Sequence, residues 1–221
     1  MTDFDIVVRE LPRLVSGFGN TILLFGLSTI GAFVLGILMM GPLRSGGQIV
    51  RTVLRFYVDG MRMLPFLIFV YLLYYGLPSF GVKLDAWTAG LLGLSAYHAA
   101  YVAEILRGAW DQLPSGQTES AKAHGYYGNR LVRRIILPQL ILNTAPVLGN
   151  QLIYMLKDTA FLMIITVKEL TYAASSIQSM YFVPLEPFLI AIALYWAVTL
   201  SIEALVSKIH ATAKERGLGR I

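Results

Sequence analysis

The stretch Glu119–Gln139 reads ESAKAHGYYGNRLVRRIILPQ and is the longest strongly polar stretch in the interior of an otherwise apolar chain. It carries a glutamate, a lysine, a histidine and three arginines. Of all 221 residues, 56% are hydrophobic and only 14% are charged, whereas a soluble domain usually carries about 25% charged residues. The composition therefore predicts an integral membrane protein that keeps one charged segment between two apolar spans.

The apolar residues outside this stretch fall into five blocks, each long enough to cross a bilayer, which takes roughly 20 residues per helix. Pro65 predicts a kink or a helix start inside the second block, and Pro138 redirects the chain into the fourth. We expect an all-α membrane protein, with one transmembrane domain over residues 1–221. Its five expected spans are about Leu14–Met40, Phe56–Leu77, Ala86–Leu106, Gln139–Val167 and Pro187–Ile209.

The basic residues set the orientation, because lysine and arginine are enriched in cytoplasmic loops. With the N-terminus outside and the C-terminus inside, only Arg9, Arg13, Lys83 and Lys168 face out. The net charge of +5 is then accounted for at a membrane surface, and no nucleic-acid partner is expected. The basic residues placed inside are Arg44, Arg51, Arg55, Arg107, Lys122, Arg130, Arg133, Arg134, Lys208, Lys214, Arg216 and Arg220.

Residues 110–138 therefore form a cytoplasmic loop, and its first half predicts a short helix. Ser115 is the expected N-cap and Gly125 the stop signal. Ala121 and Ala123 leave part of the helix surface thin enough for another backbone to approach closely. The following YYGNRLVRRIILP predicts a helix along the membrane surface, with arginines on one face.

A solvated positive-inside loop is the simplest interpretation of such a segment, but its spacing is more particular. It contains a Glu-small-Ala triplet, three residues, Gly, nine residues, Ile, one residue and Leu-Pro, which is the EAA signature of ABC importer permeases. The chain resembles the binding-protein-dependent permeases for polar amino acids, of the histidine/glutamine/arginine type. The residues that match the signature are Glu119, Ala121, Gly125, Ile135, Leu137 and Pro138, with Ser120 in place of its second Ala.

The resemblance extends over nearly the whole chain. VSGFGNTILL matches the start of the family's first span, AYVAEILRGAW its third span, and the KDT at Lys157–Thr159 its fourth, followed by V-x-EL. One departure lies in the second span, where the family usually has RGTP and this chain has RMLP at Arg62–Pro65. Because Gly and Thr are absent here, a contact that the family makes through the Gly backbone or the Thr hydroxyl is not carried over to this chain.

The resemblance implies a type I ABC importer permease fold in a bacterial cytoplasmic (inner) membrane, with the loop of residues 110–138 docked on an ATPase. It also implies two ATPase subunits, a second permease copy or a paralogue, and a periplasmic or lipid-anchored solute-binding protein. The cargo would be a polar amino acid or a derivative. The sequence has no G-x-x-x-x-G-K-[ST] motif, so we expect a non-enzyme whose partner ATPase binds ATP and magnesium.

Ionisable residues inside spans are costly and are usually paired or functional. Asp59 and Arg62 are three residues apart, as are Glu104 and Arg107, so local ion pairs are an alternative to a role in transport. Lys157 and Asp158 are adjacent and point in different directions on a helix. The candidate substrate pathway is Lys157, Asp158, Glu104, Asp59 and Arg62.

Other functions remain as alternatives. An ion-gradient-driven amino-acid transporter is one, although five spans do not divide into two equal inverted repeats. A membrane scaffold that only recruits an ATPase is another. Ser95 and His98 raise the question of intramembrane proteolysis, but they lie on one helix, and polar contacts between helices explain them better. Neither a catalytic residue nor a metal site is expected, and the chain has no cysteine.

Overall fold

The computed structural model describes the backbone of residues 3–215 and the side chains of residues 3–212. Arg216, Arg220 and the Lys214 side chain, which the charge argument placed inside, lie outside the described residues. The α-helices are α1 (Asp3–Arg9), α2 (Leu11–Ser45), α3 (Gln48–Met63), α4 (Phe66–Tyr71), α5 (Ala86–Asp111), α6 (Ser115–Ala123), α7 (Gly128–Leu131), α8 (Leu137–Asn143), α9 (Ala145–Asp158), α10 (Leu170–Tyr181) and α11 (Glu186–Glu215).

Short irregular turns connect some of these helices. Two are π-helical, η1 (Leu72–Gly76) and η3 (Val132–Ile136), and two are 3₁₀ turns, η2 (Leu77–Phe80) and η4 (Thr159–Ile165). No strand interrupts the helices between residues 3 and 215. The expected all-α fold is confirmed.

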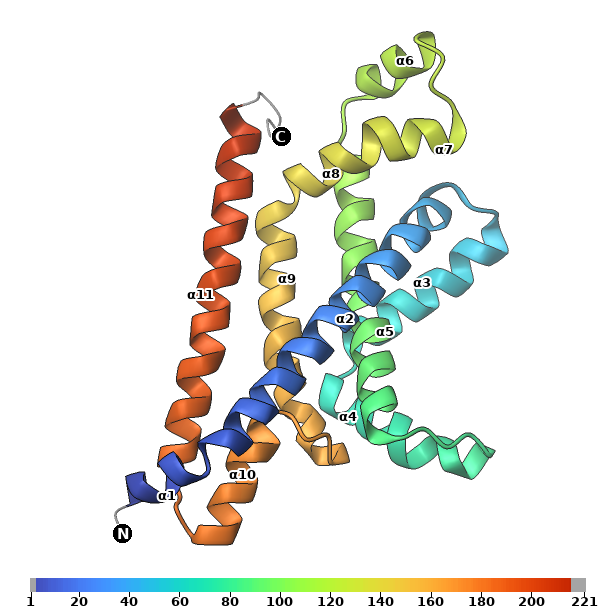
Figure 1. The fold of residues 1–221 in the computed structure, drawn as a ribbon. Helices are drawn as coiled ribbons and strands as arrows, with labels where there is room; N and C mark the ends of the chain where they lie inside the picture. Colours follow the sequence, from blue (N-terminus) through green and yellow to red (C-terminus); the bar gives the residue numbers. More distant parts are fainter. Residues whose placement is uncertain (1–2, 216–221) are drawn as a thin grey trace.

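Three helices, α2, α5 and α11, are long and apolar enough to cross a membrane, and two bent helix pairs bring the possible spans to five. The expected number of spans is therefore confirmed when each bent pair counts as one. α2 has 35 residues, which corresponds to about 52 Å of helix. This exceeds the roughly 30 Å of a bilayer core, and α2 accordingly runs obliquely across the other helices (Figure 1).

The second span, expected over about Phe56–Leu77 with a kink or a helix start at Pro65, is broken at that point and begins earlier, at Gln48. α3 ends at Met63, and the helical segment that begins at Phe66 is inclined to it by 110°. Pro65 disfavours a helical conformation at the preceding residue, and Leu64 is extended, with φ −90° and ψ 141°. Pro65 is the N-cap of α4, so the helix start that it predicted is confirmed.

The fourth span is also broken, but at a different place from the predicted one. The chain passes through Pro138 within the first turn of α8, where a missing N–H is tolerated, and bends by 69° at Thr144. Pro146 explains this position, because it cannot donate a hydrogen bond to Leu142 and so prevents one continuous helix. The redirection predicted at Pro138 therefore occurs six residues later.

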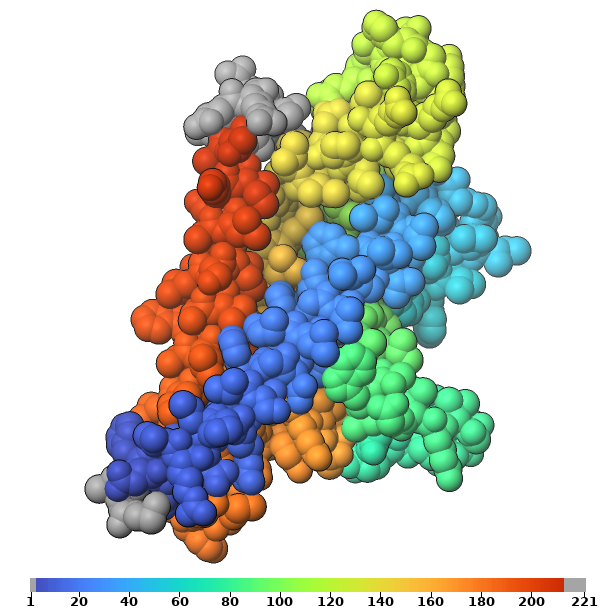
Figure 2. Space-filling model, viewed as in Figure 1, coloured from blue at the N-terminus to red at the C-terminus, as the bar shows by residue number. Residues whose placement is uncertain are grey.

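α5 forms the centre of the molecule and α2 crosses it closely. A Cβ atom on Gly36 of α2 would lie 2.6 Å from Cγ1 of Val102, so only glycine permits this approach. Figure 2 shows α2 lying diagonally across the front of the molecule. The N-terminal α1 lies with α10 at one end, and the C-terminal end of α11 lies with α6 and α7 at the other, as an N-out, C-in chain requires (Figure 1).

Candidate functional site

The charged loop projects beyond the long helices at the end where α11 finishes (Figure 1). α6 begins at Ser115, but its N-cap is Pro114, which offers no side-chain hydrogen bond. The prediction of Ser115 as N-cap is therefore wrong, because the fixed φ of the proline already directs the chain into the helix. Gly125 has φ +83°, a left-handed conformation that suits glycine after a helix end, and the predicted stop is confirmed.

The residues of the EAA signature divide into an outer and an inner set. Glu119, Ser120, Gly125 and Pro138 are exposed, whereas Ala121 is buried and Ile135 and Leu137 are half-buried. The inner set packs in one apolar cluster with Leu131, Ile136 and Leu140. Of the two alanines predicted to thin the surface of α6, only Ala123 is exposed, and Ala121 instead holds α6 against the rest of the loop.

The charges at the cytoplasmic end of α5 form a closed network. Arg107 donates two hydrogen bonds to the Glu104 carboxylate, at 2.7 and 2.8 Å, and one to Asp111, at 2.6 Å. Asp111 also accepts from Nε of Arg44 on α2, at 3.0 Å, and the Arg44 guanidinium lies over the Trp110 ring. Glu104 therefore forms the local pair that its spacing predicted.

The last turn of α3 carries the second pair, and two tyrosines of α5 hold the chain where α3 ends. Asp59 and Arg62 approach to 4.0 Å, and both are largely exposed. The Tyr97 hydroxyl donates to the carbonyl of Leu64 at 2.8 Å, and that of Tyr101 to the carbonyl of Arg62 at 3.4 Å. These contacts use backbone carbonyls, so they do not require the Gly and Thr that the RMLP sequence lacks.

A buried polar contact joins α5 to α9. His98 is 1% exposed; its Nδ1 lies 2.7 Å from Nε2 of Gln151, and its Nε2 lies 3.2 Å from Oδ2 of Asp158. Ser95 instead faces Gly31 of α2, with its Oγ 2.6 Å from where a Cβ would lie. His98 therefore contacts a neighbouring helix, as predicted, and Ser95 and His98 do not form a nucleophile and base pair.

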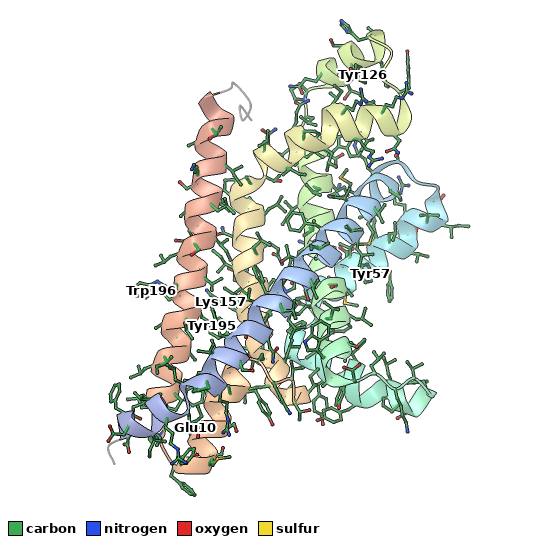
Figure 3. The ribbon with its side chains drawn as sticks, viewed as in Figure 1. Glu10, Tyr57, Tyr126, Lys157, Tyr195 and Trp196 are labelled. Atoms are coloured by element: carbon green, nitrogen blue, oxygen red, sulfur yellow. The ribbon has the colours of Figure 1, made fainter. Side chains whose placement is uncertain are left out.

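Lys157 lies on a different face of α9 from Asp158. Pro146, Gly149, Asn150 and Ile153 line a pocket between α9 and α11. Lys157 is four residues after Ile153, so it lies on the same face of α9 as these residues. Lys157 is exposed, and Figure 3 labels it in the region between α9 and α11. The expectation that Lys157 and Asp158 point in different directions is confirmed.

A buried carboxylate that the sequence did not single out as a site residue fixes the outer ends of three segments. Glu169 is fully buried; it accepts from the backbone N–H groups of Thr171 and Tyr172 and thus caps α10. It also accepts from the Tyr195 hydroxyl of α11 at 3.0 Å, and the Tyr195 hydroxyl lies 3.3 Å from the Thr159 hydroxyl. Burial raises the pKa of Glu169 to about 7, although its three donors favour the charged form.

Broken spans around a central helix, with a charged loop projecting at the cytoplasmic end, define a membrane subunit of a transport system. Residues 32–213 match the family described as "Binding-protein-dependent transport system inner membrane component". The chain belongs to this family, and it is an inner-membrane permease subunit of the ABC importer type.

Named relatives cover most of the chain. It is 32% identical over 193 residues to the probable amino-acid ABC transporter permease protein YckA of Bacillus subtilis (strain 168), which covers 87% of this chain and 85% of the relative. A solved structure described as "Crystal structure of an amino acid ABC transporter with histidines" has 33% identity and a TM-score of 0.85, covering 96% of this chain and 99% of the other. The MetNI methionine ABC transporter, at 18% identity and TM-score 0.69, shares the fold.

Proposed function

We propose that this permease carries a polar amino acid or an amino-acid derivative, driven by ATP that a separate ATPase subunit hydrolyses. Relatives at similar identity support this class of cargo. They include the probable glutamine ABC transporter permease protein GlnM (29%) and the arginine transport system permease protein ArtQ (28%) of Bacillus subtilis, and the nopaline transport system permease protein NocM (30%) of Agrobacterium fabrum. All of these cargoes carry an amino-acid ammonium or a related cationic group together with a carboxylate.

The projecting α6 is the observation that carries the proposal. Its outer residues, Glu119 and Ser120, are exposed and can enter a cleft on the ATPase. Gly125, just after α6, and Pro138, in α8, are exposed as well. The inner residue of α6, Ala121, packs with Ile135 and Leu137 in the cluster that continues into α8. The outer set docks on the ATPase, which binds ATP and magnesium, and the inner set transmits its movement to the spans.

The partners follow from the exposed surface and the family. Phe56, Asp59 and Met63 lie on one face of α3, and the two apolar side chains are each 82% exposed. A carboxylate on a face in contact with lipid is expensive, so this face suits a second permease, either a copy or a paralogue. Two ATPases then bind on the cytoplasmic side, and a solute-binding protein delivers cargo to the outer end.

Among the candidate pathway residues, Asp158 is the one that we propose meets the cargo. Glu104 and the Asp59–Arg62 pair already have ion partners, and Lys157 lies on another face of α9. The Asp158 side chain is 19% exposed, and its approach to His98 involves only one of its oxygens. A partly exposed carboxylate in this position suits the ammonium or guanidinium of an amino acid.

Co-purification and uptake test the proposal together. Glu119→Lys reverses an exposed charge on α6, and Gln112→Lys, on the exposed approach to α6, is its matched control. We expect the wild type and the control to retain the ATPase in mild detergent and Glu119→Lys to lose it. In proteoliposomes, uptake that needs internal ATP and the binding protein supports the proposal. Uptake driven by an ion gradient alone would establish the secondary-transporter alternative instead.

A further inference from the structure

All three histidines lie in the described part of the chain, and His98 is the only buried one, since His124 is exposed and His210 half-buried. Aromatic rings surround it on one side, with the centroids of Tyr97 at 5.4 Å, Phe66 at 6.2 Å and Tyr101 at 6.3 Å. Both ring nitrogens point the other way, toward α9. An apolar cage on one side and two polar partners on the other fix the orientation of the ring.

The two partners of His98 determine which nitrogen carries the proton. Gln151 and Asp158 are seven residues apart, so they lie on the same face of α9, two turns from each other. The Gln151 amide nitrogen can only donate, and therefore Nδ1 of His98 accepts its hydrogen bond, at 2.7 Å. A neutral ring then carries its proton on Nε2, the atom that faces Asp158 at 3.2 Å.

The contact with Asp158 is close but not a fully formed hydrogen bond. Nε2 of His98 is buried and satisfies hydrogen-bond geometry with no described residue, although Oδ2 of Asp158 lies within ion-pair distance. A neutral donor leaves the carboxylate its full negative charge, whereas a cationic ring would neutralise it. A neutral His98 therefore limits the movement of the Asp158 carboxylate without neutralising the negative charge that would attract a cationic cargo group.

We propose that His98, held by Gln151 in the Nε2–H tautomer, is a positioning residue that sets the Asp158 carboxylate in place for cargo. This inference rests on the proposed function for the role of Asp158 in transport, but the tautomer and the contact do not depend on it. His98 acts only through Asp158 and has no contact with cargo of its own. The cargo group that it selects is a cation, such as an ammonium or a guanidinium.

The histidine replacements form a matched set. Gln places its amide nitrogen near the position of Nε2, so His98→Gln keeps a donor toward Asp158. Asn places its amide near the position of Nδ1, so His98→Asn keeps only the side that faces Gln151. His98→Leu removes both ring nitrogens and replaces the imidazole with an apolar side chain.

Uptake is measured with radiolabelled L-glutamine, L-arginine and L-histidine, and the variants are tested with whichever the wild-type complex imports. His98→Leu and His98→Asn remove the N–H that faces the Asp158 carboxylate, so we expect each to lower the maximal uptake rate severalfold. His98→Gln should restore most of it. Co-purification of the ATPase with each variant verifies assembly.

A double-mutant cycle separates positioning from a purely structural role. Asp158→Asn should reduce uptake, and adding His98→Leu to it should cause little further loss. Full additivity of the two losses, or equal uptake by His98→Asn and His98→Gln, would overturn the inference. If the wild type imports none of these three amino acids with ATP, their assignment as cargo fails, and the tautomer measurement alone then decides this inference.

The tautomer is measured directly on ¹⁵N-histidine-labelled permease in detergent, purified with a tag that contains no histidine. His124→Gln and His210→Gln leave His98 as the sole source of signal. We expect an unprotonated Nδ1 and a protonated Nε2, and a shift of the Nε2 resonance in an Asp158→Asn background. A proton on Nδ1, in either a neutral or a cationic ring, would overturn the inference.

Discussion

Replacing Gly36 with alanine introduces a single methyl group where α2 and α5 cross. The new Cβ would lie 2.6 Å from Cγ1 and 2.8 Å from Cβ of Val102, and 3.1 Å from the backbone nitrogen of Ala103. Carbon atoms pack best at about 3.5–4.0 Å, so the neighbours must retreat by about 1 Å. Val102 has a stiff χ1 in a helix, and the Ala103 nitrogen cannot move without its backbone, so α2 and α5 must separate.

The free energy of unfolding should fall because overpacking outweighs helix propensity. Overpacking costs about 1–3 kcal/mol, and exchanging a helical glycine for alanine returns up to about 1 kcal/mol. We therefore expect Gly36→Ala to destabilise the permease by about 1–2 kcal/mol. For a chain of this length, that corresponds to a decrease in Tm of about 2–8 °C.

The assay is thermal unfolding in detergent, followed by the fluorescence of the three tryptophans. Gly26→Ala is the matched control, because Gly26 lies in the same helix and a Cβ there would meet nothing within 4 Å. The control should leave Tm unchanged or raise it slightly. Val102→Ala in the Gly36→Ala background should recover part of the loss. Equal Tm values for Gly36→Ala and Gly26→Ala would refute the argument that the crossing requires glycine.

Three further predictions concern buried and exposed polar groups. Because the pKa of Glu169 is raised from 4.5 to about 7, the folded protein keeps a proton that the unfolded chain releases, and its stability should fall by up to about 3 kcal/mol as pH rises through that window. Glu169→Gln should flatten the dependence of Tm on pH between 5 and 8, and an unchanged slope would contradict this. Thr21→Val leaves the Leu170 N–H without the acceptor it has at 3.0 Å, and should lower Tm by an amount equivalent to about 1–3 kcal/mol, whereas the exposed Ser201→Ala should not. Asp111→Asn weakens ion pairs that are only partly buried, so it should cost less than about 1 kcal/mol, and a larger loss of Tm would show that the network is structural.

The sequence predicted the features of the fold that depend on composition along the chain. Apolar blocks predicted the number of spans, and Gly125 predicted the end of α6. Pro65 was also informative, because proline restricts its neighbour regardless of tertiary contacts. Each of these signals depends either on the neighbouring residues or on the preference of apolar residues for the membrane, and not on which helices pack together.

The sequence did not predict features that arise from packing. The bend at Thr144 was assigned to Pro138, since a proline in the first turn of a helix and one that breaks a helix look alike in a sequence. α10 was not predicted, because its short polar sequence is stabilised by the Glu169 cap and by contacts with α2 and α11. The inward direction of Ala121 was not predicted either, because it depends on the packing of α6 against Leu131 and Ile136, which the sequence does not show.

The pairing of His98 with Asp158 was equally out of reach of the sequence, where the two residues were weighed separately. Their separation of 60 positions carries no periodic signal, and only the packing of α5 on α9 brings them to 3.2 Å. The seven-residue spacing of Gln151 and Asp158 was the one available clue, because it places two polar groups on one face of an apolar helix.

The position of this contact links it to the charged loop. α5 leads into the loop at Asp111 and α9 leaves the bend that follows it at Thr144, so His98 and Asp158 lie on the two helices that flank the loop. Each lies about 20 Å along its helix from the cytoplasmic end, given the usual rise per residue. A movement of α6 that shifts α9 against α5 by only about 1 Å would take the 3.2 Å contact beyond the distance of an ion pair. The loop and the carboxylate are therefore joined by two rigid helices, and a contact that is close but incompletely aligned is the kind that such a small displacement can make or break.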